Sequence, residues 1–152
     1  MHENWESALA KLLAELSAVQ QEMLDLLSKK RERMADNDLD GMTSLQNEEA
    51  ILCDRLQTCH DQRATLLHEA ESQGLPCDSL QKLANAVTPG NQGHLGKQIG
   101  EASAKMRLIQ HQSLTNWVLA QRSLLHVSQM LEIVATGGRL QPTYGSDDPS
   151  SG

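Results

Sequence analysis

The chain has 152 residues and a formal net charge of −7, so it has room for one domain with a modest core and lacks the charge of a general nucleic-acid binder. With two Trp, one Tyr and no Phe, a β-sandwich or β-barrel is not expected. Apolar runs fall short of the roughly 20 residues of a membrane span, and the acidic first residues do not resemble a signal peptide. The three cysteines, an odd number without paired spacing, suit reduced thiols in the cytoplasm.

The first predicted helix covers residues 4–35, and Asn4 is in position to cap it. Its apolar residues keep a strict heptad rhythm: Trp5, Leu9, Leu12, Leu16, Val19, Met23 and Leu26. A second set widens this stripe to one side: Leu13, Gln20 and Leu27. That width favours a helix packed against two neighbours. Because Lys30 and Arg33 then meet the stripe, we expect burial to fade before Met34.

The second predicted helix covers residues 38–73, with Asp38 as its N-cap. The polar connection before it is short, so the first two helices should be antiparallel neighbours. Its apolar stripe consists of Met42, Leu45, Leu52, Leu56, Cys59, Leu66 and Ala70. Glu49 and Arg63 interrupt that stripe. Two such charges are costly if they are buried alone, and tolerable where the bundle is open or where they find partners.

A short connecting helix is predicted over residues 78–88, with Asp78 as its cap, and a third long helix over residues 95–136. Residues 138–152 are rich in Pro, Ser and Asp and predict a flexible, disordered tail. The expected fold is therefore all-α. A long antiparallel helical hairpin and a long C-terminal helix would form a coiled-coil-like three-helix bundle domain over residues 1–137.

The last long helix carries more apolar surface than one stripe. Its main stripe consists of Leu95, Ile99, Ala102, Met106, Ile109, Trp117, Ala120, Leu124, Val127, Leu131 and Val134. Further apolar residues lie on its two flanks: Leu114, Val118 and Leu125 on one, and Leu119, Met130 and Ile133 on the other. At about 100° per residue, residues 117–135 are apolar around most of the circumference. This surface must be covered by the chain itself or by a partner.

Motifs that carry chemistry are not apparent in this sequence. No Glu-x-x-His pair suggests a di-metal site in the bundle, and Cys53, Cys59, His60 and His68 lack a recognised ligand spacing. The basic cluster at residues 29–33 could contact phosphate or an acidic partner, although its position at the end of the helix favours a solvated helix end. We therefore expect neither an enzyme nor a bound cofactor.

The order of several short motifs resembles the FlgN family of flagellar export chaperones. These motifs are LDLL at 24–27, DLDGM at 38–42, the segment 52–56, Arg63 with Leu66 and Leu67, Asn116, the Leu-rich segment to Leu131, the glycines at 137–138 and TYG at 143–145. The resemblance implies a cytoplasmic chaperone that shields the C-terminal amphipathic helices of hook-associated proteins, of the FlgK and FlgL type, before export by the flagellar type III apparatus.

The same resemblance places substrate binding in the C-terminal helical region. Here, that region includes the flanking residues Leu114, Val118, Leu119, Leu125, Met130 and Ile133. It also implies that the tyrosine of the tail, Tyr144, contacts the export gate. The alternative is a structural coiled-coil protein that forms a homodimer through the same apolar surface and needs no cargo.

Overall fold

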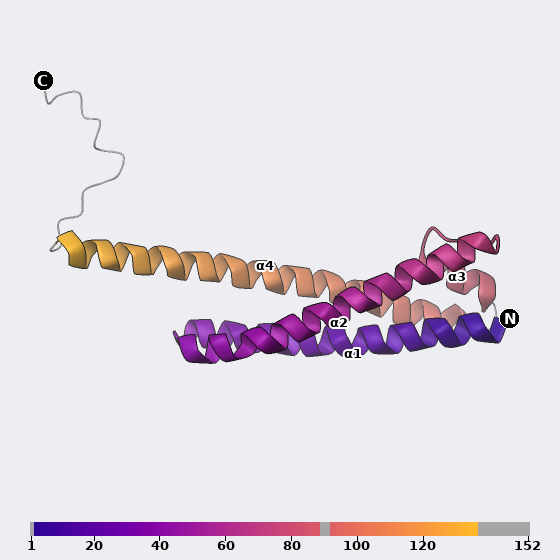
Figure 1. Cartoon of the computed structure of the whole chain (residues 1–152), viewed down its shortest axis with the longest axis horizontal. Coiled ribbons are helices and arrows are strands. Elements are labelled where there is room, and N and C mark those ends of the chain that lie inside the picture. The colour runs from indigo at the N-terminus through magenta and orange to yellow at the C-terminus, as the bar shows by residue number, and fades with distance from the viewer. Residues whose placement is uncertain (1, 89–91, 137–152) are drawn as a thin grey trace, which may run out of the picture. The chain divides into compact units, whose positions relative to one another are not determined.

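The computed structural model describes residues 2–88 and 92–136, and all its regular structure within these ranges is helical (Figure 1). The helices are α1 (His2–Ala35), α2 (Leu39–Ser72), α3 (Leu80–Val87) and α4 (Gln92–Thr136). This confirms the all-α class, with a long hairpin, a short connecting helix and a long C-terminal helix. The tail predicted at residues 138–152 lies outside the described residues.

The chain falls into two compact units, Met1–Asn116 and Trp117–Gly152, and the boundary between them lies inside α4. The first unit contains α1, α2, α3 and the first part of α4. The described part of the second unit is the remainder of α4. The extent of the domain predicted over residues 1–137 stays a prediction.

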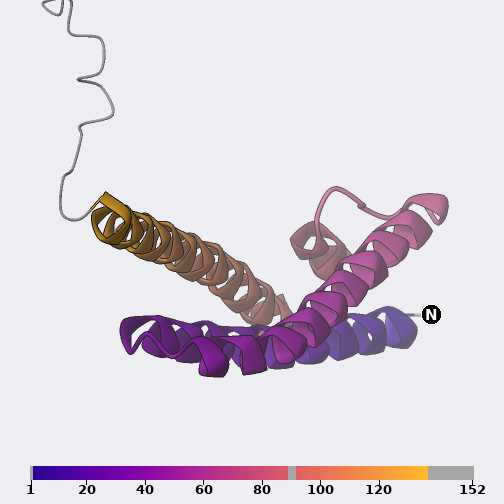
Figure 2. The same cartoon turned by 60° about the vertical axis from the view of Figure 1, so that its left-hand side comes forward.

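Within the first unit, α1 and α2 lie side by side near their connecting turn and separate toward the other end, where α3 lies (Figures 1 and 2). The core has two clusters that follow this geometry. Near the turn, Met23, Leu26, Leu45, Leu52 and Ile109 pack together. At the open end, the core is made by residues of all four helices: Trp5, Leu9, Leu12, Leu13, Val19, Cys59, Ala70, Leu80, Leu83, Ala84, Val87 and Leu95. The short helix α3 thus completes the core where the hairpin opens.

The turn between α1 and α2 explains the DLDGM motif. Asp38 caps α2 as predicted, because its Oδ1 accepts a hydrogen bond from the Gly41 N–H at 2.8 Å. A Cβ on Gly41 would overlap Oδ2 of Asp38 and Cδ of Arg33. A larger residue at this position would therefore require the Asp38 and Arg33 side chains to shift from the positions that close this cap.

Three local predictions are wrong. Asn4 lies inside α1, which begins at His2, so it is not the N-cap. Ser79 rather than Asp78 caps α3, because its hydroxyl accepts from the Lys82 N–H at 3.2 Å, while the Asp78 carboxylate pairs with the Lys82 ammonium. Extended Ser79 has the backbone conformation that a cap needs.

The third wrong prediction concerns the end of α1, where Met34 is buried. Lys30 and Arg33 do not end the packing, because α2 and its cap supply partners for both cations. The Lys30 ammonium lies 3.0 Å from Glu49, and the Arg33 guanidinium lies 3.6 Å from Asp38. Glu49, one of the two charges that interrupt the apolar stripe of α2, is therefore paired within the bundle.

Candidate functional site

A network of polar side chains fixes the first part of α4 against α1. The Gln20 amide donates to the Ala102 carbonyl at 2.9 Å. Further along, the amide of buried Asn116 donates to the Leu27 carbonyl at 2.9 Å, and its Oδ1 accepts from Arg31 Nε at 3.2 Å. Because buried polar groups need their hydrogen bonds, these contacts specify the register of the two helices. Asn116, one of the residues behind the family resemblance, thus holds the end of the first unit in place.

The basic cluster at residues 29–33 is largely used by the fold. Lys30 pairs with Glu49, Arg33 pairs with Asp38, and Arg31 bonds to Asn116. Lys29 is left as an exposed cation. These contacts favour a structural role for the cluster over an anion-binding site.

A large exposed apolar surface covers the second unit. We call it the α4 apolar surface, and it consists of Trp117, Leu124, Leu125, Val127, Met130, Leu131, Ile133 and Val134. Trp117 is 60% exposed, and Val134 is 77% exposed. Isolated exposed apolar side chains are common in proteins, whereas eight of them on one helix segment make this segment a candidate interaction site.

The six residues predicted to bind substrate differ in how exposed they are. Leu125, Met130 and Ile133 belong to the α4 apolar surface, and Leu114 is exposed in the preceding turn of the first unit. Val118 and Leu119 are half-buried. Substrate binding by these six residues stays a prediction, and Tyr144, predicted to dock on the export gate, lies outside the described residues.

The residues predicted to bind substrate lie on the flanks of the stripe, but the second half of the stripe itself is also open. Trp117, Leu124, Val127, Leu131 and Val134 are all more than half exposed. Helix length is the signal that could have indicated this. With 45 residues, α4 is longer than α1 or α2 at 34 each. Neither helix of the hairpin is long enough to cover the whole stripe.

Among the described residues, the Cys59 thiol is shifted away from reactivity. Burial raises the pKa of the Cys59 thiol, the Glu15 carboxylate adds to this effect, and Arg55 opposes it. The protonated thiol is a poor nucleophile. Arg55 itself joins α2 to α1 through Glu22 at 2.6 Å and Glu15 at 3.1 Å, and these hydrogen bonds raise its pKa.

In the described ranges, no group of three or more His, Cys, Asp or Glu side chains is placed to hold a metal ion. None of the helices described has the length and apolar character needed to cross a membrane.

Comparison with known proteins gives the context for the α4 apolar surface. A family model described as FlgN protein matches residues 1–149. Searches of curated proteins and of solved structures each found no match. The family is one of chaperones for flagellar biogenesis rather than of enzymes. The chain therefore belongs to the FlgN family, with a general role as a flagellar export chaperone.

Proposed function

We propose that this chain is a cytoplasmic chaperone that covers the C-terminal amphipathic helices of hook-associated proteins, of the FlgK and FlgL type, until they are exported. The observation that carries this proposal is the α4 apolar surface. Trp117, Leu124 and Leu131 lie at heptad spacing and are each at least 60% exposed. An amphipathic helix offers a matching apolar stripe, and packing the two together removes both from water.

Such a chaperone acts by burying the apolar surface of its cargo. A cargo segment is disordered before assembly and prone to self-association, and ordering it on the chaperone costs free energy. Burial of apolar area, at about 25 cal/mol per Å², offsets that cost and leaves a moderate affinity. Moderate affinity suits a cargo that must later be released.

The composition of the surface indicates how cargo is selected. Between Trp117 and Thr136, Arg122 and Glu132 are the only Lys, Arg, Asp or Glu residues. With so few charges, recognition depends on apolar fit rather than on ion pairs, and binding should change little with salt. Met130 adds a flexible side chain that can adapt to different cargo helices.

Delivery is assigned to the tail in this proposal. Tyr144 is the chain's single tyrosine and is surrounded by Pro, Ser, Thr, Gly and Asp residues. An aromatic side chain in such a setting suits a docking residue for the export gate. We expect Tyr144→Ala to leave cargo binding unchanged and to reduce export, and a loss of cargo binding would refute this division of roles.

A second candidate function is self-association, which the heptad spacing of the same exposed stripe also favours. A homodimer would cover Trp117, Leu124 and Leu131 with their copies and would need no cargo. Sedimentation across a dilution series separates the two candidates. A monomer at low micromolar concentration supports the chaperone function, whereas a dimer that persists on dilution supports the structural one.

Binding to the C-terminal segment of a hook-associated protein tests the proposal directly. Leu125→Asp and Leu131→Asp should each weaken binding by at least about tenfold, because an unpaired carboxylate would be buried. Ile51→Asp is the matched control, since Ile51 is a comparably exposed apolar residue of α2. It should leave binding unchanged. If all three variants bind cargo like the natural sequence, the α4 apolar surface is not the site.

A further inference from the structure

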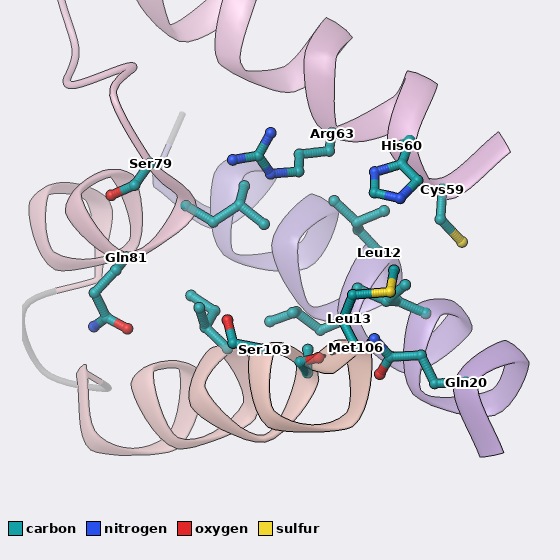
Figure 3. Close-up of a pocket in the computed structure, with 14 residues that line it drawn as sticks. Leu12, Leu13, Gln20, Cys59, His60, Arg63, Ser79, Gln81, Ser103 and Met106 are labelled. Atoms are coloured by element: carbon teal, nitrogen blue, oxygen red, sulfur yellow. Dashed lines mark hydrogen bonds between the residues drawn. The ribbon is translucent and has the colours of Figure 1, made fainter. Parts of the chain in front are cut away.

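The first unit contains a pocket that the proposed function does not use. Its volume is about 290 Å³, and it lies where α1, α2, α3 and the first part of α4 meet (Figure 3). The walls are mainly apolar, with Leu12, Leu13, Leu16, Ile99 and Met106 among the lining residues. Pockets for whole small molecules generally measure about 300–1,000 Å³. The volume lies at the lower end of that range and is large enough for one aromatic side chain.

A buried polar group of the pocket wall lacks a partner. Gln20 lines the pocket and is 1% exposed. Its Nε2 donates to the Ala102 carbonyl, but its Oε1 has no hydrogen-bond partner among the described residues. An unpaired buried carbonyl is costly, so a hydrogen-bond donor arriving at this oxygen would be stabilising.

Met106 is the residue that adapts the pocket to such a donor. Figure 3 shows its side chain rising from α4 beside the amide of Gln20. Its flexible thioether can move aside for an incoming group and also makes favourable contacts with aromatic rings. The walls thus favour an aromatic ring, and Gln20 favours a ring that carries a donor.

A free cation stands at the edge of the same pocket. Arg63 is exposed, and Figure 3 shows its guanidinium extending from α2 toward the side formed by α3. Arg55, two turns earlier on α2, is held by Glu15 and Glu22. No hydrogen bond or ion pair engages Arg63 in the part of the chain that the structure describes. Its charge is available for a carboxylate next to the bound side chain.

We propose that this pocket binds a tyrosine side chain of a protein partner, with an acidic residue next to that tyrosine. The ring packs on the apolar walls and Met106, the hydroxyl donates to Gln20 Oε1, and the neighbouring carboxylate pairs with Arg63. The site lies within the first unit, whereas the α4 apolar surface belongs to the second. It is therefore a second docking point that does not depend on the proposed cargo function.

Titration with the blocked dipeptide N-acetyl-Tyr-Glu-amide tests this site. The readout is the methyl NMR signal of Met106 in methionine-labelled full-length protein, assigned with Met106→Leu. We expect a saturable shift with a dissociation constant of roughly 1–10 mM, as befits one anchoring side chain. N-acetyl-Phe-Glu-amide should bind about 3- to 10-fold more weakly, because it lacks the hydroxyl. Equal binding of the two peptides would overturn the assignment to tyrosine.

Three variants test whether the shift of the Met106 signal arises from binding in the pocket. Ser103→Leu, at an exposed lining position, should abolish the shift, while Ala104→Leu, next to it and outside the pocket, should not. Arg63→Gln should weaken binding about 2- to 5-fold, as expected for one exposed ion pair. All three positions are exposed, so these variants should fold normally. No saturable shift, or a shift that Ser103→Leu leaves intact, would show that the pocket is only a packing gap.

A last variant tests whether the chain's own tyrosine, Tyr144, occupies the pocket. Tyr144→Phe should leave the Met106 signal unchanged, both without the peptide and during the titration. If Tyr144→Phe shifts that signal without any peptide, the occupant is the tail of this protein, and the proposal of a partner protein is wrong.

Discussion

The two parts of α4 share one apolar rhythm but differ in what covers them. In the first unit, Leu95 and Ile109 are 2% and 7% exposed. In the second unit, Leu124 and Leu131 occupy positions of the same stripe and are 61% and 64% exposed. The rhythm therefore specifies a helix and an apolar stripe, whereas burial depends on a second element that lies against the stripe.

Polar contacts add a second difference between the two parts. In the first part, Ala102 and Asn116 make hydrogen bonds to α1. In the described residues of the second part, the one side-chain hydrogen bond found runs from Thr136 to Glu132 within the helix itself. The first part is thus specified by directional contacts as well as by burial. The second offers mainly apolar area, which accepts partners with less regard to their exact geometry.

The largest expected effect on the free energy of unfolding comes from shortening one apolar side chain of the stripe in each part of α4. Ile109→Ala should lower the free energy of unfolding by about 2–5 kcal/mol, because it leaves a cavity in the core. Leu131→Ala should change it by less than about 0.5 kcal/mol, as for an exposed side chain. Urea denaturation followed by circular dichroism measures both. A comparable loss in Leu131→Ala would mean that the free chain covers its own surface, and the chaperone proposal would lose its basis.

A smaller effect is expected at Asn116, where the two parts meet. Asn116→Ala removes the hydrogen bonds that Asn116 makes to the Leu27 carbonyl and accepts from Arg31, and it should cost about 1–3 kcal/mol. The neighbouring variant Thr115→Ala loses only a hydrogen bond within α4 and should cost less than about 0.5 kcal/mol. Amide hydrogen exchange of residues 102–116 should accelerate in Asn116→Ala alone. Equal exchange in both variants would show that Asn116 does not fix this part of α4.

The fold could be predicted because its helices are long and periodic. The cap at Asp38 was also predictable, since a short polar connection leaves few candidates for it. The caps at Asn4 and Asp78 were not, because a cap depends on backbone conformation as well as on residue type. Met34 is buried next to cations that pair with α2 and its cap, and periodicity within α1 does not specify such contacts.

The candidate sites were predictable to different degrees. The surplus of apolar residues in α4 is visible in the sequence, so the region of the α4 apolar surface was indicated before its exposure was known. The pocket in the first unit was not, because Gln20, Arg63 and Met106 come from three helices and have no common spacing. Gln20 was read as part of an apolar stripe, and its unpaired oxygen appears only once α4 is in place.

Two glycines offer a matched test with effects of opposite sign. Gly41→Ala should cost about 1–2 kcal/mol, because the added Cβ overlaps Asp38 and disturbs the cap of α2. Gly100 lies in the first part of α4, where a Cβ meets nothing within 4 Å. Gly100→Ala should therefore stabilise the protein by about 0.5–1 kcal/mol. Thermal unfolding of the two variants measures both, and a destabilised Gly100→Ala would mean that this part of α4 packs more closely than the structure shows.

The smallest effect expected is a dependence on pH at Cys59, which lines the pocket together with the first part of α4. Because burial raises its pKa in the folded chain, the unfolded chain loses the thiol proton at a lower pH. The stabilising contribution is complete below the unfolded pKa, near 8.5, and is lost as pH rises through the folded pKa. The natural sequence should therefore lose stability relative to Cys59→Ala above about pH 8.5. Parallel stability curves for the two proteins would indicate that the first part of α4 leaves Cys59 open to water.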